Sequence, residues 1–421
     1  MTGIRQVVSC LDGYDPEALH VDKARAAIRA CLSPIEETER AKTRDALGRV
    51  LAEDIVPAID VPGHDNSAMD GYAVRSSDLN PRNEVVLKQI GTALAGRPFM
   101  QPLGPGQCVR VMTGAVMPRG ADAVVIQEVV RATGDAVVVP PGQKAGQNVR
   151  YAGEDLTAGV AVLKAGALLR PAELGVIASL GLGEVRVRRR LRVAFFSTGD
   201  ELASIGAALA EGQVYDSNRY TLHGMLARLG VEAADLGVVR DDPAALEAAF
   251  RKAAAQADAI VTTGGVSVGE ADFVKALMAK LGEVLFWKIA LRPGRPMAFG
   301  RIGDAFLFGL PGNPVAVMVA FYELVRDALW ILAGRSGDFA IPLLKAISAN
   351  AIRKIPGRTE YQRGILFREG GEWKVRTTGQ QGSGVLRSMA EANCFIVLEH
   401  ERGRVEAGEP VPVQLFDGLA G

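Results

Sequence analysis

Segment 192–333 alternates apolar runs with amphipathic stretches, and this alternation limits the fold more than any other feature of the 421-residue chain. We expect strands at RVAFFS, EAADLGVV, DAIVTT, VLFWKIAL and AFLFGL, and helices at SNRYTLHGMLARLG, DDPAALEAAFRKAAAQA and ADFVKALMAKLG. Asp242 is the expected N-cap of the second helix, with Pro243 at its first position. Strands that alternate with helices in this way predict a mainly parallel sheet covered on both faces.

Such a sheet binds its ligands beyond the carboxyl ends of its strands. The loops expected there are STGDEL (197–202), the loop 237–242, TTGGVSVGEAD (262–272) and GLPGNP (309–314). A glycine-rich turn between a strand and a helix points main-chain N–H groups at an anion, typically a phosphate. Tight packing of the helix against the strand is the alternative explanation for these glycines.

Carboxylates accompany the glycine-rich loop. Glu270 and Asp272 lie within it, and Glu201 and Asp241 follow neighbouring strands. The helix dipole alone favours acids in a first helical turn. Several acids at one sheet edge would nevertheless repel a phosphate unless a hard cation lies between them, and Mg²⁺ binds through carboxylates and phosphate oxygens. The loops therefore predict a Mg²⁺-bound di- or triphosphate-like group.

A basic turn, FWKIALRPGRP (286–296), follows the next strand. It carries Lys288, Arg292 and Arg295, and Pro293 and Pro296 stiffen it. The guanidinium fork suits tetrahedral oxyanions and carboxylates, although a solvated basic turn is the alternative. No Ser-His-Asp or Cys-His grouping is legible in the sequence, which argues against nucleophilic catalysis by the protein.

Composition excludes several classes of partner. The formal net charge is zero, so we expect no nucleic-acid partner. The N-terminus lacks an apolar leader and the longest apolar stretch is too short to span a bilayer, so we expect a cytoplasmic protein with no membrane partner. Four cysteines are too scattered for a disulfide framework or a zinc site: Cys10, Cys31, Cys108 and Cys394.

The pattern differs outside the alternating segment. Residues 17–56 read as two helices, PEALHVDKARAAIRACL and RAKTRDALGRVLAEDI, and residues 57–146 read as short strands between Gly and Pro. Residues 150–190 combine the helix RPAELGVIASLG with the start of a basic strand, EVRVRRRLRV, whose arginines favour a solvated face over a polyanion site. From residue 336 the chain is again β-rich, with a hairpin expected around Gly370–Gly371.

Seven motifs resemble the MoeA family of molybdopterin molybdenumtransferases, which is related to the gephyrin E domain. They are DNSAMDGYAVR, VRVMTGAVMPRGADAVVIQE, NVRYAGEDLTAG, FSTGDEL, QVYDSNR, GGVSVGEADF and GLPGNPVA. The resemblance implies a multidomain α/β plus β fold whose centre is a three-layer α/β molybdopterin-binding domain with a mainly parallel sheet (191–335). Around it, the resemblance implies a discontinuous N-terminal dimerisation domain (17–56 and 147–190), an inserted β-rich domain (57–146) and a C-terminal β-barrel-like domain (336–421). It also implies a homodimer whose active cleft the partner completes.

The implied reaction inserts molybdate into adenylated molybdopterin, with Mg²⁺ and with release of AMP, and the molybdopterin adenylyltransferase would supply the substrate. The catalytic set comprises Asp70, Thr113, Glu201, Asp241 and Asp272, together with Lys288 of the basic turn, and Asp241 and Asp272 would hold the metal. The pterin nucleotide would contact Ser197, Thr198, Gly199, Asp216, Asn218, Gly264, Gly265, Ser267, Gly269, Pro311, Gly312, Asn313 and Pro314. Molybdate would contact Arg292, Arg295, Pro296, Arg363 and Ser383.

One motif departs from the family pattern, and two other functions stay open. The family commonly has Lys-Pro-Gly-Lys-Pro where this chain has Arg292-Pro-Gly-Arg295-Pro, which leaves the preference among molybdate, tungstate and sulfate undetermined. The alternatives are a molybdopterin adenylyltransferase and a gephyrin-like dimeric scaffold without catalysis. Domains flanking the α/β segment argue against the first, and the acids at 201, 241 and 272 argue against the second.

Overall fold

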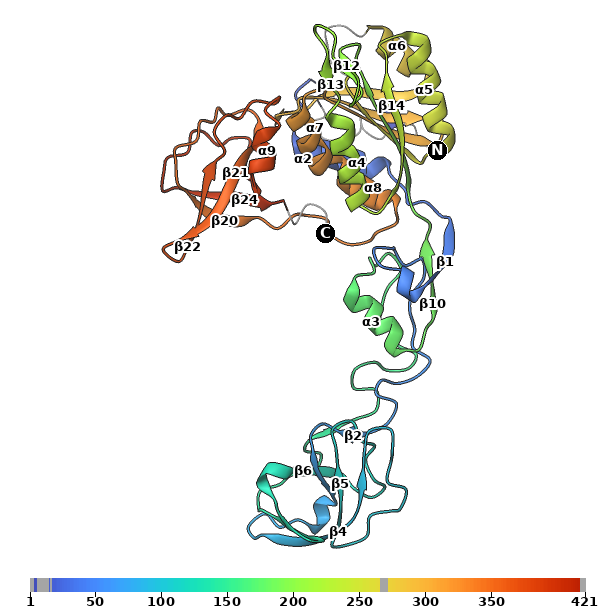
Figure 1. The fold of residues 1–421 in the computed structure, drawn as a ribbon, viewed down its shortest axis with the longest axis vertical. Helices are drawn as coiled ribbons and strands as arrows, with labels where there is room; N and C mark the ends of the chain where they lie inside the picture. The colour runs from blue at the N-terminus through green and yellow to red at the C-terminus, as the bar shows by residue number, and fades with distance from the viewer. Residues whose placement is uncertain (1–3, 6–14, 16, 266–271, 417–421) are drawn as a thin grey trace.

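The computed structural model describes residues 4–5, 15, 17–265 and 272–416. The chain is elongated, with an α/β unit and a β-barrel at one end, a small unit in the middle and a β-rich unit at the other end (Figure 1). Among the described residues, no helix is long and apolar enough to cross a membrane.

The α/β unit is built on a six-stranded sheet with the order β14-β11-β15-β19-β18-β16. The first four strands are parallel, and β18 runs antiparallel to both of its neighbours. The predicted mainly parallel sheet is therefore confirmed, although β18 was not expected. The strands are β11 (Arg192–Thr198), β14 (Glu232–Val239), β15 (Ala259–Thr263), β16 (Gly282–Lys288), β18 (Pro296–Ile302) and β19 (Ala305–Leu310).

Helices cover both faces of this sheet because alternate residues of its buried strands point to opposite sides. Val193 and Phe195 share one core with α2, α4, α7 and α8, whereas Ala194 and Phe196 share another with α5 and α6. As predicted, α5 begins at Pro243 after the N-cap Asp242. The helices are α2 (Val21–Cys31), α4 (Asn218–Arg228), α5 (Pro243–Gln256), α6 (Asp272–Leu281), α7 (Pro314–Ala320), a π-helical turn η4 (Phe321–Val325) and α8 (Arg326–Leu332).

The C-terminal unit is a closed barrel, because the ring of pairings β21-β22-β20-β24-β23 returns to β21. Its hairpin turns at Gly370 and Gly371, which both have positive φ, so the predicted hairpin is confirmed. Strand β17 of the basic turn adds to the barrel beside β21. The elements are β17 (Leu291–Arg292), β20 (Leu344–Ser348), β21 (Thr359–Glu369), β22 (Glu372–Thr377), α9 (Arg387–Glu391), β23 (Cys394–Leu398) and β24 (Pro410–Leu415).

The β-rich unit far from the barrel is a six-stranded sheet with the order β6-β3-β5-β4-β8-β7, beside which β2 and β9 pair. Short 3-10 turns, η2 and η3, follow β3 and β6. The elements are β2 (Asn66–Ser67), β3 (Gly71–Val74), η2 (Ser76–Asp78), β4 (Val85–Ala93), β5 (Gln107–Val111), β6 (Ala123–Ile126), η3 (Gln127–Val129), β7 (Arg131–Thr133), β8 (Ala136–Val139) and β9 (Val149–Arg150).

The middle unit corrects one prediction. The expected helix RAKTRDALGRVLAEDI is wrong: Thr38–Lys42 is strand β1, followed by a 3-10 turn η1 (Thr43–Asp45), and β1 pairs antiparallel with β10 (Glu184–Arg188). The apolar residues at helical spacing instead reach one small core through strand pairing, so that tertiary contacts override local propensity. That core joins residues 41–55 to residues 169–187, including α3 (Pro171–Ser179).

Candidate functional site

Polar side chains from separate loops meet at the carboxyl edge of the α/β sheet. Ser197 at the end of β11 donates to Asp216 Oδ1 at 3.1 Å, and Thr263 at the end of β15 donates to Ser197 Oγ at 3.1 Å. Asp216 is 1% exposed and also accepts the main-chain N–H of Arg219. The structure therefore brings together Ser197 and Asp216, two of the residues predicted from sequence.

The glycine-rich loop begins against the end of β11. Gly264 and Gly265 have φ of 86° and 66°, and a Cβ on Gly264 would lie 2.4 Å from the carbonyl oxygen of Thr198. Both positions therefore require glycine. The loop continues through Ser267 and Gly269, which lie outside the described residues, as does Glu270.

Two buried polar atoms at this edge have no hydrogen-bond partner among the described residues: Thr198 Oγ1 and Asn218 Oδ1. The amide nitrogen of Asn218 donates to the carbonyl oxygen of Gly312 at 2.6 Å, which joins the start of α4 to the predicted loop around Asn313. Pro311 is buried at the end of β19, and Pro314 is the first residue of α7. Because buried polar atoms are nearly always paired, the two unpaired oxygens favour a polar ligand here.

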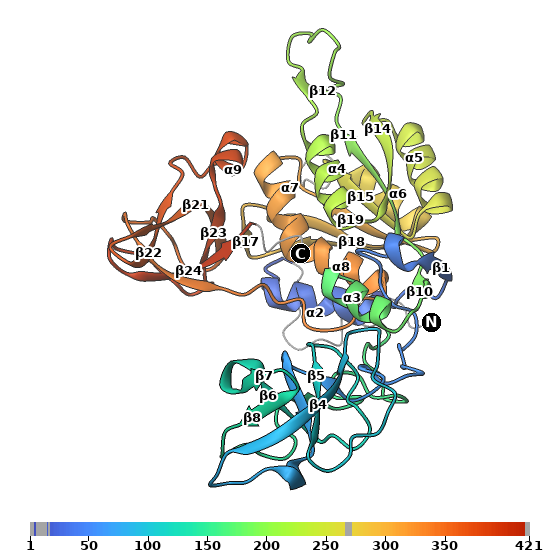
Figure 2. The ribbon, with the colours of Figure 1, turned by 60° about the horizontal axis from the view of Figure 1, so that its bottom comes forward.

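Carboxylates lie on the loops that follow β11 and β14. Glu201 folds over Gly199, where a Cβ would lie 2.4 Å from its carboxylate, and it precedes an arm formed by β12 (Leu202–Ala203) and β13 (Val214–Tyr215) that projects beyond the sheet (Figure 2). Asp200 accepts the main-chain N–H of Asp241 at 3.3 Å, so these two loops are tied together. Asp200 was not predicted as a site residue, although it stands in the loop STGDEL.

This arrangement fits a Mg²⁺ ion held jointly with a phosphate. Among the described residues, no group of three or more His, Cys, Asp or Glu side chains could hold a metal on its own. Mg²⁺ needs only one or two carboxylates beside phosphate oxygens, and Asp241 and Glu201 offer hard oxygen ligands on adjoining loops. Asp272 begins α6, and its side chain lies outside the described part of the chain.

The basic turn divides into two parts. Lys288 forms an ion pair with Glu17, and the guanidinium of Arg295 donates to the carbonyl oxygen of Glu17 at 3.3 Å. Arg292 instead extends toward the barrel, where its guanidinium lies 3.2 Å from Glu360 Oε1. Pro296 begins β18. The sequence places all three side chains on one turn. The structure separates Lys288 and Arg295 from Arg292.

A cavity of about 520 Å³ lies where Arg292 meets the barrel. Its wall is rich in cationic and amide side chains, with Glu360 as its carboxylate. The polar side chains that line it are Arg292, Arg353, Lys354, Glu360, Gln362, Arg363, Thr377 and Gln381.

Arg363 is the most deeply buried cation of this cavity, with 1% of its surface exposed. Its guanidinium donates to Ser388 Oγ and to the carbonyl oxygen of Gly382, both at 3.0 Å, and it forms no ion pair with any described carboxylate. Burial, and then the charge of Arg292, lower the pKa of Arg363 to about 10. A buried guanidinium without a counter-ion favours an anion in the cavity.

Ser383 connects the cavity to the α/β sheet edge. Its carbonyl oxygen accepts the main-chain N–H of Val315, in the first turn of α7, at 3.0 Å. Gly382, whose carbonyl oxygen accepts from Arg363, precedes Ser383 on the same loop. This loop therefore lies against α7, the helix that follows Pro311 and Gly312. The two candidate anion sites are consequently adjacent.

Asp70 and Thr113 lie in the distant β-rich unit. Asp70 accepts the main-chain N–H of Thr113 at 2.7 Å and its hydroxyl at 2.9 Å, and these hydrogen bonds lower the pKa of Asp70. Within one chain this unit lies at the opposite end of the molecule from the α/β sheet (Figure 1). The structure thus pairs the two predicted residues with each other but does not bring them to the other site residues of the same chain.

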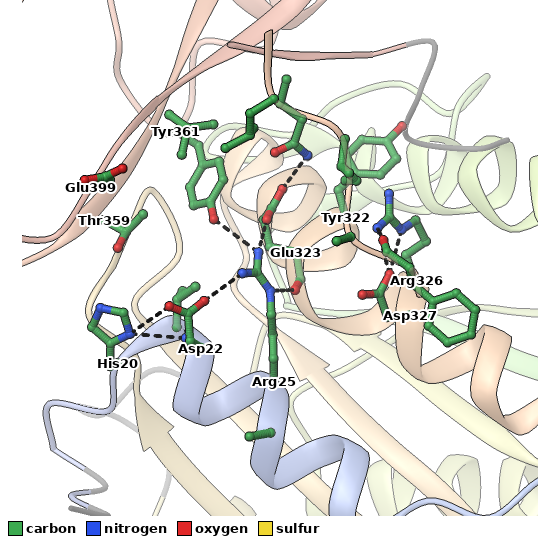
Figure 3. A pocket seen from close by; sticks show the side chains of 18 of the residues that line it. His20, Asp22, Arg25, Tyr322, Glu323, Arg326, Asp327, Thr359, Tyr361 and Glu399 are labelled. Carbon is green, nitrogen blue, oxygen red and sulfur yellow. Dashed lines mark hydrogen bonds and ion pairs between the residues drawn. The ribbon is translucent and has the colours of Figure 1, made fainter. Parts of the chain in front are cut away.

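A second cavity, of about 800 Å³, lies between α2, η4 and the barrel and was not predicted from sequence (Figure 3). Arg25 crosses it to the buried carboxylate of Glu323, and it also donates to Tyr361 at 3.2 Å and to Asp22 at 3.0 Å. Gln414 of β24 donates to Glu323 at 2.8 Å. This network ties the barrel to the α/β unit.

The fold and the site together define a multidomain α/β protein with two adjacent candidate anion sites, one at the sheet edge and one where Arg292 meets the barrel. Comparison with known families gives the same division. Residues 19–181 match the MoeA N-terminal region (domain I and II), residues 194–330 match a probable molybdopterin binding domain, and residues 345–416 match the MoeA C-terminal region (domain IV).

Individual relatives agree over nearly the whole chain. A molybdopterin molybdenumtransferase of Haemophilus influenzae is 45% identical over 96% of this chain and 100% of its own length, and one of Nostoc is 36% identical over 90% and 88%. The crystal structure of a molybdopterin biosynthesis moeA protein from Pyrococcus horikoshii superposes with a TM-score of 0.82 at 29% identity, over 95% of this chain and 100% of that one. The chain belongs to the MoeA family and is a transferase of molybdenum cofactor biosynthesis.

Proposed function

We propose that this transferase inserts molybdate into adenylated molybdopterin in a Mg²⁺-dependent reaction that releases AMP. The observation that carries the proposal is Arg363, a buried guanidinium without a carboxylate partner among the described residues, on a cavity adjacent to the α/β sheet edge. A tetrahedral dianion supplies the missing negative charge. The relatives named molybdopterin molybdenumtransferase support molybdate as that anion.

The oxyanion would be bound from the barrel side. Arg292 and Arg363 line the cavity, and Ser383 lies on the loop between the cavity and α7. Arg295 and Pro296 belong to the same turn as Arg292 and complete the proposed set, with Arg295 releasing its contact to Glu17 when the anion binds. The role of the protein here is to hold the anion in place beside the second substrate.

The pterin nucleotide would occupy the sheet edge. The unpaired oxygens of Thr198 and Asn218 and the glycines at 264 and 265 are suited to its polar groups and to a close approach of its phosphates. The same ligand would contact Ser197, Gly199, Asp216, Ser267, Gly269, Pro311, Gly312, Asn313 and Pro314.

Asp241 and Asp272 would hold Mg²⁺ against the phosphoanhydride, with Glu201 beside them. When bound, the ion stabilises charge on the departing phosphate. The carboxylates would act on the phosphates through the ion that they hold, and the tie between Asp200 and the Asp241 main chain keeps the loops after β11 and β14 together. Lys288 is the remaining proposed catalytic residue, and its ion pair with Glu17 would have to open.

We further propose a cytoplasmic homodimer in which Asp70 and Thr113 of one subunit complete the cleft of the other. The separation of the β-rich unit from the α/β sheet within one chain supports this (Figure 1). The core shared by residues 41–55 and 169–187 supports the discontinuous dimerisation domain. A molybdopterin adenylyltransferase is the proposed donor of the nucleotide substrate.

The test is incubation of the pure protein with adenylated molybdopterin, Mg²⁺ and molybdate, followed by measurement of AMP. We expect AMP release that requires molybdate and falls when Mg²⁺ is chelated. Consumption of ATP with non-adenylated molybdopterin would instead identify an adenylyltransferase. A folded protein that is inactive in both assays would favour a scaffold.

A further inference from the structure

The cavity of about 520 Å³ where Arg292 meets the barrel contains more positive charge than its ion pairs neutralise. Glu360 is 2% exposed and accepts from Arg292 at 3.2 Å and from Gln362 at 3.0 Å, so its charge is matched by that of Arg292. Two buried cations then remain in the wall, Arg363 and Lys354. Together these two cations carry the positive charge that would balance a tetrahedral dianion.

Lys354 is unusual for a lysine because it is 4% exposed. Its ammonium donates to two main-chain carbonyl oxygens, those of Ile355 at 2.9 Å and His400 at 3.4 Å, and it forms no ion pair with any described carboxylate. Burial is the main cause that lowers its pKa. The charges of Arg358 and Arg292 lower it further, and those of Glu360 and Glu401 oppose them. A buried ammonium in this state is costly unless the cavity supplies a negative charge.

Lys354 also has a donor to spare. An ammonium group carries three N–H donors, and two of them point to the carbonyl oxygens. No third acceptor is found among the described residues, and Lys354 lines the cavity. Arg292, Lys354 and Arg363 come from β17, the 349–358 segment and β21, so donors reach the cavity from separate segments.

We infer that Lys354 is a binding residue for the oxyanion, donating its third N–H to an anion oxygen and, together with Arg363, matching the charge of the dianion. The inference rests on the proposed function and adds to it a residue outside the basic turn. It gives Lys354 a larger part in anion affinity than Arg295, which does not line this cavity.

The test uses the full-length protein and molybdate alone as the probe, with affinity measured by calorimetry. Lys354→Met should weaken molybdate binding roughly ten- to a hundredfold, as expected for the loss of one charge-assisted hydrogen bond. Lys345→Met, which removes an exposed lysine of β20, is the matched control and should bind as the wild type does. Lys354→Arg should keep an affinity close to that of the wild type, since it keeps the charge.

Arg363→Gln separates the inference from the proposed function. If Arg363→Gln loses molybdate affinity while folded Lys354→Met retains it, Lys354 has no part in the site and the inference is overturned. If wild-type protein does not bind molybdate, or Arg363→Gln binds it normally, the proposed anion site itself is wrong. Should Lys354→Met fail to fold, Lys354→Gln decides: a roughly ten- to a hundredfold loss of molybdate affinity supports the inference, and binding equal to that of the wild type overturns it.

Discussion

Arg363 combines near-complete burial with a full positive charge, which destabilises a fold unless an anion compensates for it. Its hydrogen bonds go to the neutral acceptors Ser388 and Gly382, which do not supply that compensation. The nearby carboxylate of Glu360 is matched with Arg292 instead. The proposed anion would supply this compensation, so we expect its binding to stabilise the fold.

Glu360 should weaken anion binding, because it occupies Arg292 and adds negative charge to the cavity wall. Glu360→Gln keeps the shape of the side chain and frees Arg292, so we expect molybdate to bind about tenfold more tightly. Calorimetry measures this, with Glu369→Gln as the control, an exposed glutamate of the same strand. Weaker binding in Glu360→Gln would mean that Glu360 chiefly orients Arg292.

The sequence indicated the residue types of the site better than their partners. Resemblance placed Arg292 and Arg363 in one anion site, and both line the cavity. Periodicity could not pair Arg292 with Glu360, because the two are 68 residues apart and meet only once β17 has joined the barrel. Asp200 was missed for a related reason, since its contact with Asp241 requires adjacent loops of a folded sheet.

At the scale of elements, the sequence predicted best where the hydrophobic pattern is local. The strands and helices from Arg192 to Leu310 were largely predicted because each carries its own periodicity and its own turn residues. Strand β1 was mistaken for helix because its partner lies more than a hundred residues away, in β10. Strand β18 was missed because it begins at a proline and contains Gly300, whose missing side chain allows close packing on Glu283.

Asp258 directly precedes β15, and it binds the segment that connects β10 to β11. Arg189 donates to its two oxygens at 2.7 and 2.8 Å, and the main chain of Arg192 donates at 2.8 Å. Burial raises the pKa of Asp258, but these donors outweigh it and the net pKa is lowered. Ionised Asp258 therefore stabilises the fold above its unfolded-state pKa of about 3.9, and this contribution is lost as the pH falls through the lower folded-state value.

Asp258→Asn should accordingly lower the free energy of unfolding by about 2 kcal/mol at neutral pH. The difference from wild type should shrink as the pH approaches about 4 and below, where wild-type Asp258 also loses its charge. Denaturant unfolding across this pH range measures it. Asp304→Asn, at a fully exposed position, is the control. A difference that does not change with pH would exclude the ion pair as its cause.

The contact of Arg25 with Glu323 holds α2, η4 and the barrel in one arrangement (Figure 3). Arg25→Met leaves the 2%-exposed carboxylate of Glu323 without its cation, so we expect a loss of about 3 kcal/mol in the free energy of unfolding. Arg29→Met removes an exposed arginine of the same helix and should cost much less. Equal effects of the two changes on denaturant unfolding would show that the buried pair contributes little.

At the scale of the whole molecule, the elongated chain separates the proposed site residues into two groups. The β-rich unit that carries Asp70 and Thr113 lies at one end, and the α/β unit and the barrel lie at the other (Figure 1). A twofold dimer can bring the first group of one subunit to the second group of its partner. Neither periodicity nor composition could predict this separation, which the resemblance alone indicated.

Mixed dimers test this arrangement. Asp70→Ala and Asp241→Ala subunits should each be inactive alone, and random pairing should restore about a quarter of the wild-type rate of AMP release, since half of the subunits enter hybrids with one intact site. A mixture of Asp70→Ala and Thr113→Ala subunits is the control and should recover nothing, because both changes lie in the same half of the site. Verified hybrids of the first kind without activity would mean that each site is built within one chain.

The most direct test of the proposed reaction is the stoichiometry of a single turnover. Adenylated molybdopterin bound to the protein is mixed with Mg²⁺ and molybdate, and the AMP released and the molybdenum retained on the pterin are measured in the same sample. If metal insertion and loss of AMP are one reaction, the two amounts are equal and both are absent without molybdate. Release of AMP without retained molybdenum would identify a hydrolase of the adenylated pterin and contradict the proposed function.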